Sequence, residues 1–180
     1  MKHFWNILLA IIITIFLILV LNPAKAETIK GYARVIDGDT IEINNEKIRF
    51  ACVDTPESKY KGKTQYCLDD ETNCGKAAKR ALESFIDGDE VICFYEKRDI
   101  YGRILGFCQA AFWGDYFNDK DTYNYELVYH GFAWYYDGGK ECKMYQEAFE
   151  DAREAKSGLF QDNLGGFKEP KLWRKTRSNN

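Results

Sequence analysis

The residues best suited to chemistry in this chain lie between positions 37 and 57. Asp37–Thr40 (DGDT) begins the segment, Asp54–Glu57 (DTPE) ends it, and Arg49 lies between them. Carboxylate and carbonyl oxygens are the hard ligands that Ca²⁺ prefers. Because the residues between the two motifs are typical of strands that fold back on each other, we expect the acids to converge at one end of a sheet.

A second arginine, Arg103, follows Tyr101-Gly102 at the predicted start of a later strand. A cation and two guanidinium groups would stabilise the negative charge that develops on a phosphodiester as water attacks it. The chain has 2 histidines, and only His130 lies beyond the N-terminal 26 residues. Mechanisms that need two histidines are therefore excluded, which leaves carboxylates, arginines and a metal ion.

Each of these motifs is weak when taken alone. A second Asp-Gly-Asp, at Asp87–Asp89, is not followed by Asp-Thr-Pro-Glu, and we interpret it as a turn between a helix and a strand. Arg49 alone could form a salt bridge on a strand, and Arg103 alone could belong to a turn. The functional interpretation therefore depends on the ordered set of motifs.

Short β-branched and aromatic runs between turn residues predict strands, and longer periodic segments predict helices. The expected strands cover residues 31–36, 40–43, 47–53, 90–95 and 103–112, and the expected helices cover residues 74–85, 122–130 and 143–157. Residues 54–73 are predicted to form a polar loop. The fold class indicated is α+β (mainly β), an OB-type five-stranded Greek-key barrel with about three helices.

The N-terminal segment has the layout of a secretory signal peptide. Lys2 precedes the unbroken apolar run Ile7–Leu21, and Ala24-Lys25-Ala26 follows it. The run is shorter than the roughly 20 residues that span a bilayer as a helix, which favours cleavage after Ala26 over an uncleaved anchor. We expect a signal peptide at 1–26, a single domain at 27–180, and a secreted or periplasmic product with no stable membrane association.

The charge of the chain is negative, with 25 basic and 28 acidic residues. Loss of residues 1–26, which hold two lysines and no acid, would lower the net charge from −3 to −5. This counts against a sequence-independent nucleic-acid binder, which normally presents a basic face. It is compatible with an enzyme that has a locally basic site and a bound cation. Separately, the C-terminal tail from Phe167 is basic, with Lys168, Lys171, Arg174, Lys175 and Arg177.

All 6 cysteines lie beyond residue 26, and in an oxidising compartment they are expected to form disulfides. A zinc site is disfavoured because the chain has no C-x-x-C pair. Cys93 and Cys108 are expected to pair because two predicted strands place them opposite each other. Cys67 and Cys74 are expected to pair because they are close in the sequence. Cys52 and Cys142 are paired only by elimination, and free thiols are the alternative for these cysteines.

The ordered motifs resemble the thermonuclease (staphylococcal-nuclease-like) family, in its secreted bacterial cysteine-containing branch. The resemblance runs from about Lys30 to Phe160 and includes a terminal helix with Glu150. Further matching segments are Tyr101-Gly102-Arg103, Asn124–Ala133, Gln65-x-Cys67, Cys74–Ala78 and the tail pattern Phe167-x-x-Pro170-x-x-Trp173-Arg174. Ile100 departs from the pattern, because the family usually has a basic residue there.

The resemblance implies a calcium site and assigns its ligands. Asp39 and Asp54 would be the calcium carboxylates and the backbone carbonyl of Thr55 a further ligand. Asp37 would lie in the outer shell, where it would hold water.

The resemblance also implies roles in the reaction. Glu57 would be the general base, and Arg49 and Arg103 would bind the phosphate. Tyr135 and Tyr136 are the candidates for tyrosines that stack on the substrate base, and core packing is the alternative for both.

The function implied is that of a secreted, monomeric, calcium-dependent nuclease that hydrolyses DNA and RNA with little sequence preference. The alternative is a non-catalytic OB-type module that binds nucleic acid or protein. Family relatives that become binding modules usually lose the acids or the arginine pair, and this chain retains both. The negative net charge favours the alternative.

Overall fold

The structure of the chain is a computed structural model that describes residues 4–8, 11–14, 26–114, 117–136 and 138–178. The predicted signal peptide lies mainly outside these residues, since residues 1–3, 9–10 and 15–25 are not described. Among the described residues, no helix combines the length and the apolar character needed to cross a membrane.

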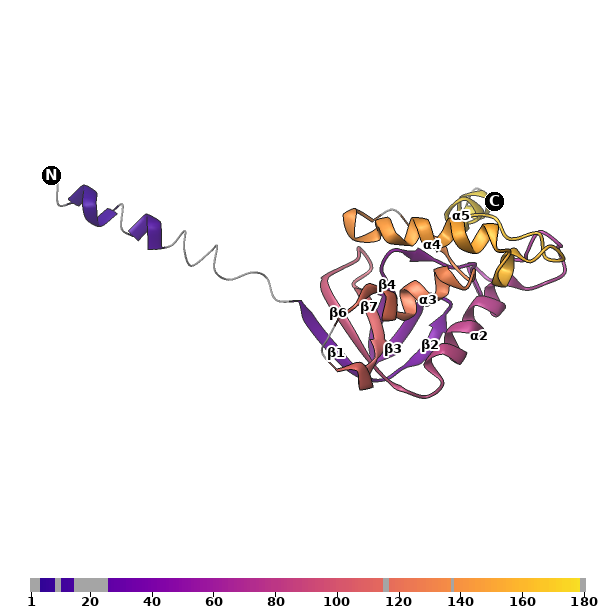
Figure 1. Cartoon of the computed structure of the whole chain (residues 1–180), viewed down its shortest axis with the longest axis horizontal. Helices are drawn as coiled ribbons and strands as arrows, with labels where there is room; N and C mark the ends of the chain where they lie inside the picture. Colours follow the sequence, from indigo (N-terminus) through magenta and orange to yellow (C-terminus); the bar gives the residue numbers. More distant parts are fainter. Residues whose placement is uncertain (1–3, 9–10, 15–25, 115–116, 137, 179–180) are drawn as a thin grey trace.

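A curled six-stranded sheet forms the body of the domain (Figure 1). Its strand order is β1-β6-β7-β4-β3-β2, and β4 pairs with β7 in parallel. The strands are β1 (Glu27–Tyr32), β2 (Arg34–Asp37), β3 (Thr40–Ile43), β4 (Glu46–Phe50), β6 (Glu90–Arg98) and β7 (Ile104–Ala110). Only Ala33 separates β1 from β2, yet these two strands lie at opposite ends of the strand order. The sheet must therefore curl until its two edges approach each other.

The predicted count of five strands is wrong, because the first predicted strand divides at Ala33. Residues 27–32 pair with β6, whereas residues 34–37 pair with β3. A chain segment that contributes to both edges of a curled sheet has to bend between them, and Ala33 is where it does. A second, two-stranded sheet joins β5 (Val53–Asp54) to β8 (Trp134–Tyr135).

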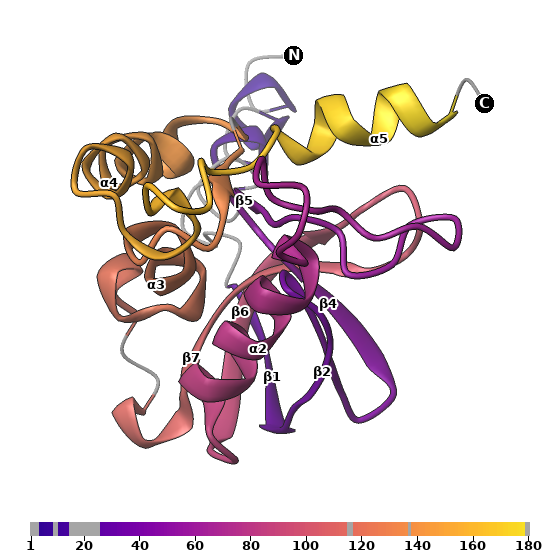
Figure 2. The ribbon, with the colours of Figure 1, turned by 90° about the vertical axis from the view of Figure 1, so that its right-hand side faces the viewer.

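Among the described residues beyond Ala26, three α-helices match the predicted ones and a fourth was not predicted. They are α2 (Cys74–Ile86), α3 (Tyr123–Tyr129), α4 (Lys143–Glu154) and α5 (Pro170–Ser178). The helix α4 ends three residues earlier than expected because Lys156 adopts a left-handed conformation, with φ of 53°. The helix α5 begins at a proline, whose fixed φ suits the first helical position, and it lies beside the connection between β5 and α2 (Figure 2).

The core lies between the concave face of the sheet and the helices. Buried aliphatic and aromatic side chains from both fill it, among them Ile41, Ile48, Phe50, Leu82, Leu127 and Phe149. Short 3₁₀ turns at Ala111–Trp113, Asp119–Asp121, Lys140–Cys142 and Gly158–Phe160 complete the connections.

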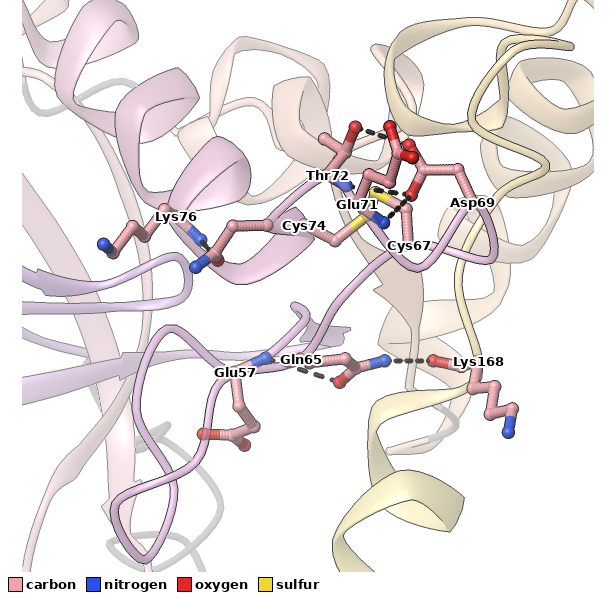
Figure 3. Close-up of a disulfide and its surroundings, with 10 residues drawn as sticks. Glu57, Gln65, Cys67, Asp69, Glu71, Thr72, Cys74, Lys76 and Lys168 are labelled. Atoms are coloured by element: carbon pink, nitrogen blue, oxygen red, sulfur yellow. Dashed lines mark hydrogen bonds between the residues drawn. A yellow bond between two sulfur atoms is a disulfide. The ribbon is translucent and has the colours of Figure 1, made fainter.

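Three disulfides cross-link the domain: Cys52–Cys142, Cys67–Cys74 and Cys93–Cys108. These are the same three pairs that the sequence predicted. Cys93 and Cys108 are direct partners in the antiparallel register of β6 and β7, which places their side chains on the same face of the sheet. Cys67–Cys74 joins the connection between β5 and α2 to the first residue of α2 (Figure 3).

Candidate functional site

A cavity of about 870 Å³ contains most of the chemically competent residues predicted from the sequence. The predicted residues that line it are Asp37, Asp39, Arg49, Glu57 and Arg103. Asp54 and Thr55 are buried beside it, each 2% exposed. The tertiary structure thus brings the two motifs and both arginines to one place.

The turn between β2 and β3 delivers the first two acids. Asp37 ends β2 and Asp39 precedes β3, with Gly38 between them. A Cβ atom at Gly38 would lie 2.6 Å from the hydroxyl oxygen of Thr55, so a larger residue would separate the two motifs. Glycine is therefore required at position 38 because the backbone of the turn approaches the Thr55 side chain closely. The role of glycine in an ordinary Asp-Gly-Asp turn would not by itself require this.

Arg49 bridges two buried carboxylates. Its Nη1 donates to Oδ2 of Asp39 and its Nη2 to Oδ1 of Asp54, both at 2.7 Å. Arg49 lies opposite Thr40 in the register of β3 and β4, which places it next to Asp39. Burial alone would lower the pKa of Arg49, but Asp39 and Asp54 outweigh it and the pKa is raised. The guanidinium therefore stays charged.

Asp39 and Asp37 have different surroundings. Asp39 also accepts hydrogen bonds from the Thr40 hydroxyl at 2.9 Å and from the backbone N–H of Thr55 at 3.3 Å. Asp37 accepts from the backbone N–H groups of Gly38 and Ser58, at 2.8 and 3.2 Å. Burial and the charge of Asp39 raise the pKa of Asp37, and the hydrogen bonds from Ser58 and Gly38 oppose this shift.

Glu57 is held by contacts to its backbone as well as to its side chain. A Cβ atom at Gly75 in α2 would overlap the backbone carbonyl of Glu57, so only glycine allows this approach. The backbone N–H of Glu57 donates to Oε1 of Gln65 at 3.4 Å (Figure 3). Burial raises the pKa of the Glu57 carboxyl to about 7, against the opposing effect of a hydrogen bond from Arg174. A carboxylate with a pKa near neutrality is well matched to general-base catalysis.

Arg174 of α5 belongs to this cluster, although its sequence context predicted a basic tail that matches the family pattern and no role in the site. Its Nη1 donates to Oε1 of Glu57 at 2.6 Å and to Oδ1 of Asp54 at 3.0 Å, and its Nη2 donates to Oδ2 of Asp54 at 2.8 Å. Burial alone would lower the pKa of Arg174. The opposing effects of Asp54 and Glu57 are larger together, so the pKa is raised. The match of Trp173-Arg174 to the tail pattern of the family was the available signal, and it did not indicate which acids Arg174 would reach.

Arg103 lies on another wall of the cavity and is held by Asp99. Its Nε and Nη2 each lie 2.7 Å from Oδ2 of Asp99. The other carboxylate oxygen of Asp99 accepts from the backbone N–H groups of Tyr101 and Arg103, at 2.9 and 3.0 Å. Asp99 thus fixes both the turn and the side chain, and a guanidinium has further N–H donors for a ligand.

Of the two tyrosines suggested for base stacking, only Tyr136 lines the cavity, where it is 41% exposed. Tyr135 belongs to β8 and packs on Phe149, with ring centroids 5.4 Å apart. Tyr60 and Tyr101 also line the cavity and were not predicted to do so. The strand β8 ends at Tyr135, and Tyr136 follows it in the connection to the next element.

The donor chemistry near Asp39 fits a hard cation. Asp39 and Asp54 share Arg49, and the backbone of Thr55 lies against Asp39. Carboxylates together with a backbone carbonyl are oxygen donors of the type that Ca²⁺ takes. Within the described ranges, however, no group of three or more His, Cys, Asp or Glu side chains is arranged to hold a metal ion.

The chain is similar to known nucleases along most of its length. The family model described as "Staphylococcal nuclease homologue" matches residues 47–162. An uncharacterized endonuclease of Escherichia coli is 30% identical over 157 residues, which cover 84% of this chain and 89% of that protein. A micrococcal nuclease of Shigella flexneri is 30% identical over 165 residues, which cover 87% of this chain and 86% of that protein.

A third similarity is higher but covers less of each protein. The succinoglycan biosynthesis protein ExoI of Rhizobium meliloti (strain 1021) is 40% identical over 94 residues, which are 50% of this chain and 47% of that protein. The chain thus aligns with less than half of that relative, but with most of the two enterobacterial proteins. Because the family model matches more than half of the sequence, including Arg49, Glu57 and Arg103 of the cavity and the neighbouring Asp54, the chain belongs to the staphylococcal nuclease family.

Proposed function

We propose that this protein is a calcium-dependent phosphodiesterase that hydrolyses DNA and RNA with little sequence preference. The observation that supports this most is the single cavity lined by Arg49, Glu57 and Arg103, next to the buried Asp54. The similarity to an uncharacterized endonuclease of Escherichia coli and to a micrococcal nuclease of Shigella flexneri also supports the proposal.

In the proposed reaction, Glu57 accepts a proton from a water molecule that attacks the phosphorus atom. The bond between phosphorus and the leaving oxygen breaks as the new bond to the water oxygen forms. Arg49 and Arg103 donate hydrogen bonds to the phosphate oxygens, on which negative charge increases. Both guanidinium groups are already oriented by aspartates, which limits the entropy lost when substrate binds.

Calcium would be held by Asp39, Asp54 and the carbonyl of Thr55, with Asp37 holding water in the outer shell. When bound, it supplies positive charge next to the reacting phosphate and polarises its oxygens. Other residues of the chain position these ligands. Arg49 keeps Asp39 and Asp54 together, and Gly38 allows the turn to reach Thr55.

We further propose that the curled sheet is an OB-type barrel, with β1 and β2 as one bent strand that closes it. The strand order and the parallel pairing of β4 with β7 support this. We also propose that residues 27–180 act as a monomeric secreted or periplasmic domain after cleavage behind Ala26. The three disulfides support an oxidising compartment.

A non-catalytic OB-type binding module is the second candidate. It is favoured by the net charge of −3 and by the engagement of the acids Asp54 and Glu57 with Arg174. Such a module would bind nucleic acid or protein without hydrolysing either.

Cleavage of labelled DNA and RNA oligonucleotides, with Ca²⁺ or with a chelator, separates the candidates. We expect cleavage of both polymers with Ca²⁺ and none with the chelator. Glu57→Gln keeps the shape of the side chain but removes the base, and should lower the rate by about 10² or more. Full activity of this variant, or of the wild type in chelator, would reject the mechanism. Binding of an oligonucleotide without cleavage under every condition would support the module.

A further inference from the structure

The helix α5 is attached firmly to the wall of the cavity. Trp173 is buried, and its ring meets that of Tyr60 at a centroid distance of 6.3 Å. The fully buried Gln65 donates from Nε2 to the backbone carbonyl of Lys168 at 2.6 Å and accepts from the backbone N–H of Glu57 (Figure 3). Arg174 adds the hydrogen bonds to Asp54 and Glu57. One face of α5 is therefore fixed relative to the predicted general base.

The same attachment directs two lysines to the cavity. Lys171 and Lys175 both line it, together with Arg174. Residues three and four apart lie on one face of a helix, so the spacing of these three residues explains why they share the cavity. Lys171 and Lys175 are one helical turn apart, about 6 Å along the axis.

These two lysines differ from the arginines of the cavity in that their charge is not already paired with a carboxylate of the described residues. Arg49, Arg103 and Arg174 each contact one or two carboxylates. Within the part of the chain that the structure describes, neither Lys171 nor Lys175 pairs with an acid. Carboxylates also outnumber arginines around the cavity, in Asp37, Asp39, Asp54, Glu57 and Asp99. The positive charge available to a polyanion is therefore on α5.

An exposed aromatic ring lies next to this charge. The ammonium nitrogen of Lys171 lies 5.3 Å from the centroid of the Tyr136 ring, and both residues line the cavity. Grooves that bind a nucleic-acid strand combine cations, which follow the backbone, with aromatic rings on which bases stack. Lys171 and Tyr136 provide one of each at the same edge.

We propose that Lys171 and Lys175 of α5 form a binding subsite for the phosphates of nucleotides that flank the scissile bond. The inference rests on the proposed function, because it requires a nucleic-acid strand in the cavity. The subsite would lengthen the contact with substrate beyond the reacting phosphate. It would also give a protein of negative net charge a local attraction for a polyanion.

The test compares Lys171→Gln/Lys175→Gln with the control Lys140→Gln/Lys143→Gln. The control removes the same charge from exposed lysines that border a different surface. Binding of a fluorescent single-stranded octanucleotide is measured by anisotropy in chelator at several salt concentrations. Each lost phosphate contact should lower the slope of log affinity against log salt by about 0.7. We expect a decrease of about 1.4 and roughly tenfold weaker binding at low salt for the α5 variant only.

A second readout uses cleavage with Ca²⁺ of a dinucleotide and of the octanucleotide. The α5 variant should raise KM for the octanucleotide, with kcat unchanged, and leave cleavage of the dinucleotide as in the wild type. Equal salt slopes and equal octanucleotide KM values for the two double variants would overturn the subsite. Failure of the wild type to cleave either substrate would reject the proposed function instead, while the anisotropy result would still decide whether α5 binds the strand.

Discussion

Arg174 and Asp54 form a bidentate ion pair. Nη1 of Arg174 donates to Oδ1 of Asp54 at 3.0 Å, and Nη2 donates to Oδ2 at 2.8 Å. The two residues are 120 positions apart in the chain. The Asp54 side chain is 3% exposed and that of Arg174 is 22% exposed. A helix at the C-terminal end of the domain thus neutralises an acid that the family resemblance assigns to calcium.

The first prediction concerns this contact. Arg174→Gln leaves Asp54 and Glu57 with less positive charge nearby, and removal of one partner of a buried ion pair costs on the order of 3 kcal/mol. For a domain of this size that is about 6–12 °C in Tm. We expect this loss in chelator and a smaller loss with Ca²⁺, because a bound cation would neutralise the same acids.

Thermal unfolding with and without Ca²⁺ measures the effect. Arg177→Gln is the matched control, since Arg177 is on the same helix and lies over the Trp173 ring at 5.5 Å without reaching the acids. Equal Tm values for the Arg174 variant and this control in chelator would contradict the prediction.

The second prediction is that lysine cannot replace Arg49. The planar guanidinium binds Asp39 and Asp54 at the same time, whereas an ammonium group is a point charge without this fork. Arg49→Lys should lower kcat by about 10² to 10³, with Tm within a few degrees of the wild type. Arg34→Lys, at an exposed strand arginine paired with Glu42, should change neither. An unfolded Arg49→Lys protein whose residual rate is normal would make Arg49 structural.

The third prediction tests the close approach of α2 to Glu57. In most helices a change from glycine to alanine is stabilising by roughly 0.5–1 kcal/mol. At Gly75 the added methyl group would overlap the backbone of Glu57, so Gly75→Ala should lower both Tm and kcat. Lys76→Ala, at the next, exposed position of α2, is the control for helix propensity. A rise in Tm for Gly75→Ala would show that the backbone of Glu57 is not in contact with this position.

The fourth prediction orders the three disulfides by the loops they close. The sequence separations are 90, 15 and 7 residues. In the chain-entropy model, replacement of both cysteines by alanine should cost about 4.6 kcal/mol for Cys52–Cys142, about 3 for Cys93–Cys108 and about 2.4 for Cys67–Cys74. Urea unfolding of the three double variants measures this order. Peptide mapping of unreduced protein checks the pairing, and a Cys93 peptide linked to any cysteine other than Cys108 would reject it.

Much of the local structure could be predicted because it depends on neighbours in the chain. The apolar spacing of Ala77, Ala78, Ala81, Leu82 and Phe85 predicts an amphipathic helix, and α2 forms there. The Cys93–Cys108 pair could be predicted because an antiparallel hairpin fixes which residues are opposite once its turn is located. The order of the acidic and arginine motifs was sufficient to identify the family.

The sequence by itself therefore predicted the family, the helices α2 to α4, the disulfide pairs and part of the cavity lining, namely Asp37, Asp39, Arg49, Glu57 and Arg103. Only the tertiary structure decided that the first strand divides at Ala33, that Tyr136 rather than Tyr135 lines the cavity, and that Arg174 reaches Glu57, 117 residues away. The physical reason is that periodicity and turn residues report short-range preferences of the backbone. The edge that a strand joins, and the acid that a distant arginine meets, depend on how the sheet curls and where α5 packs.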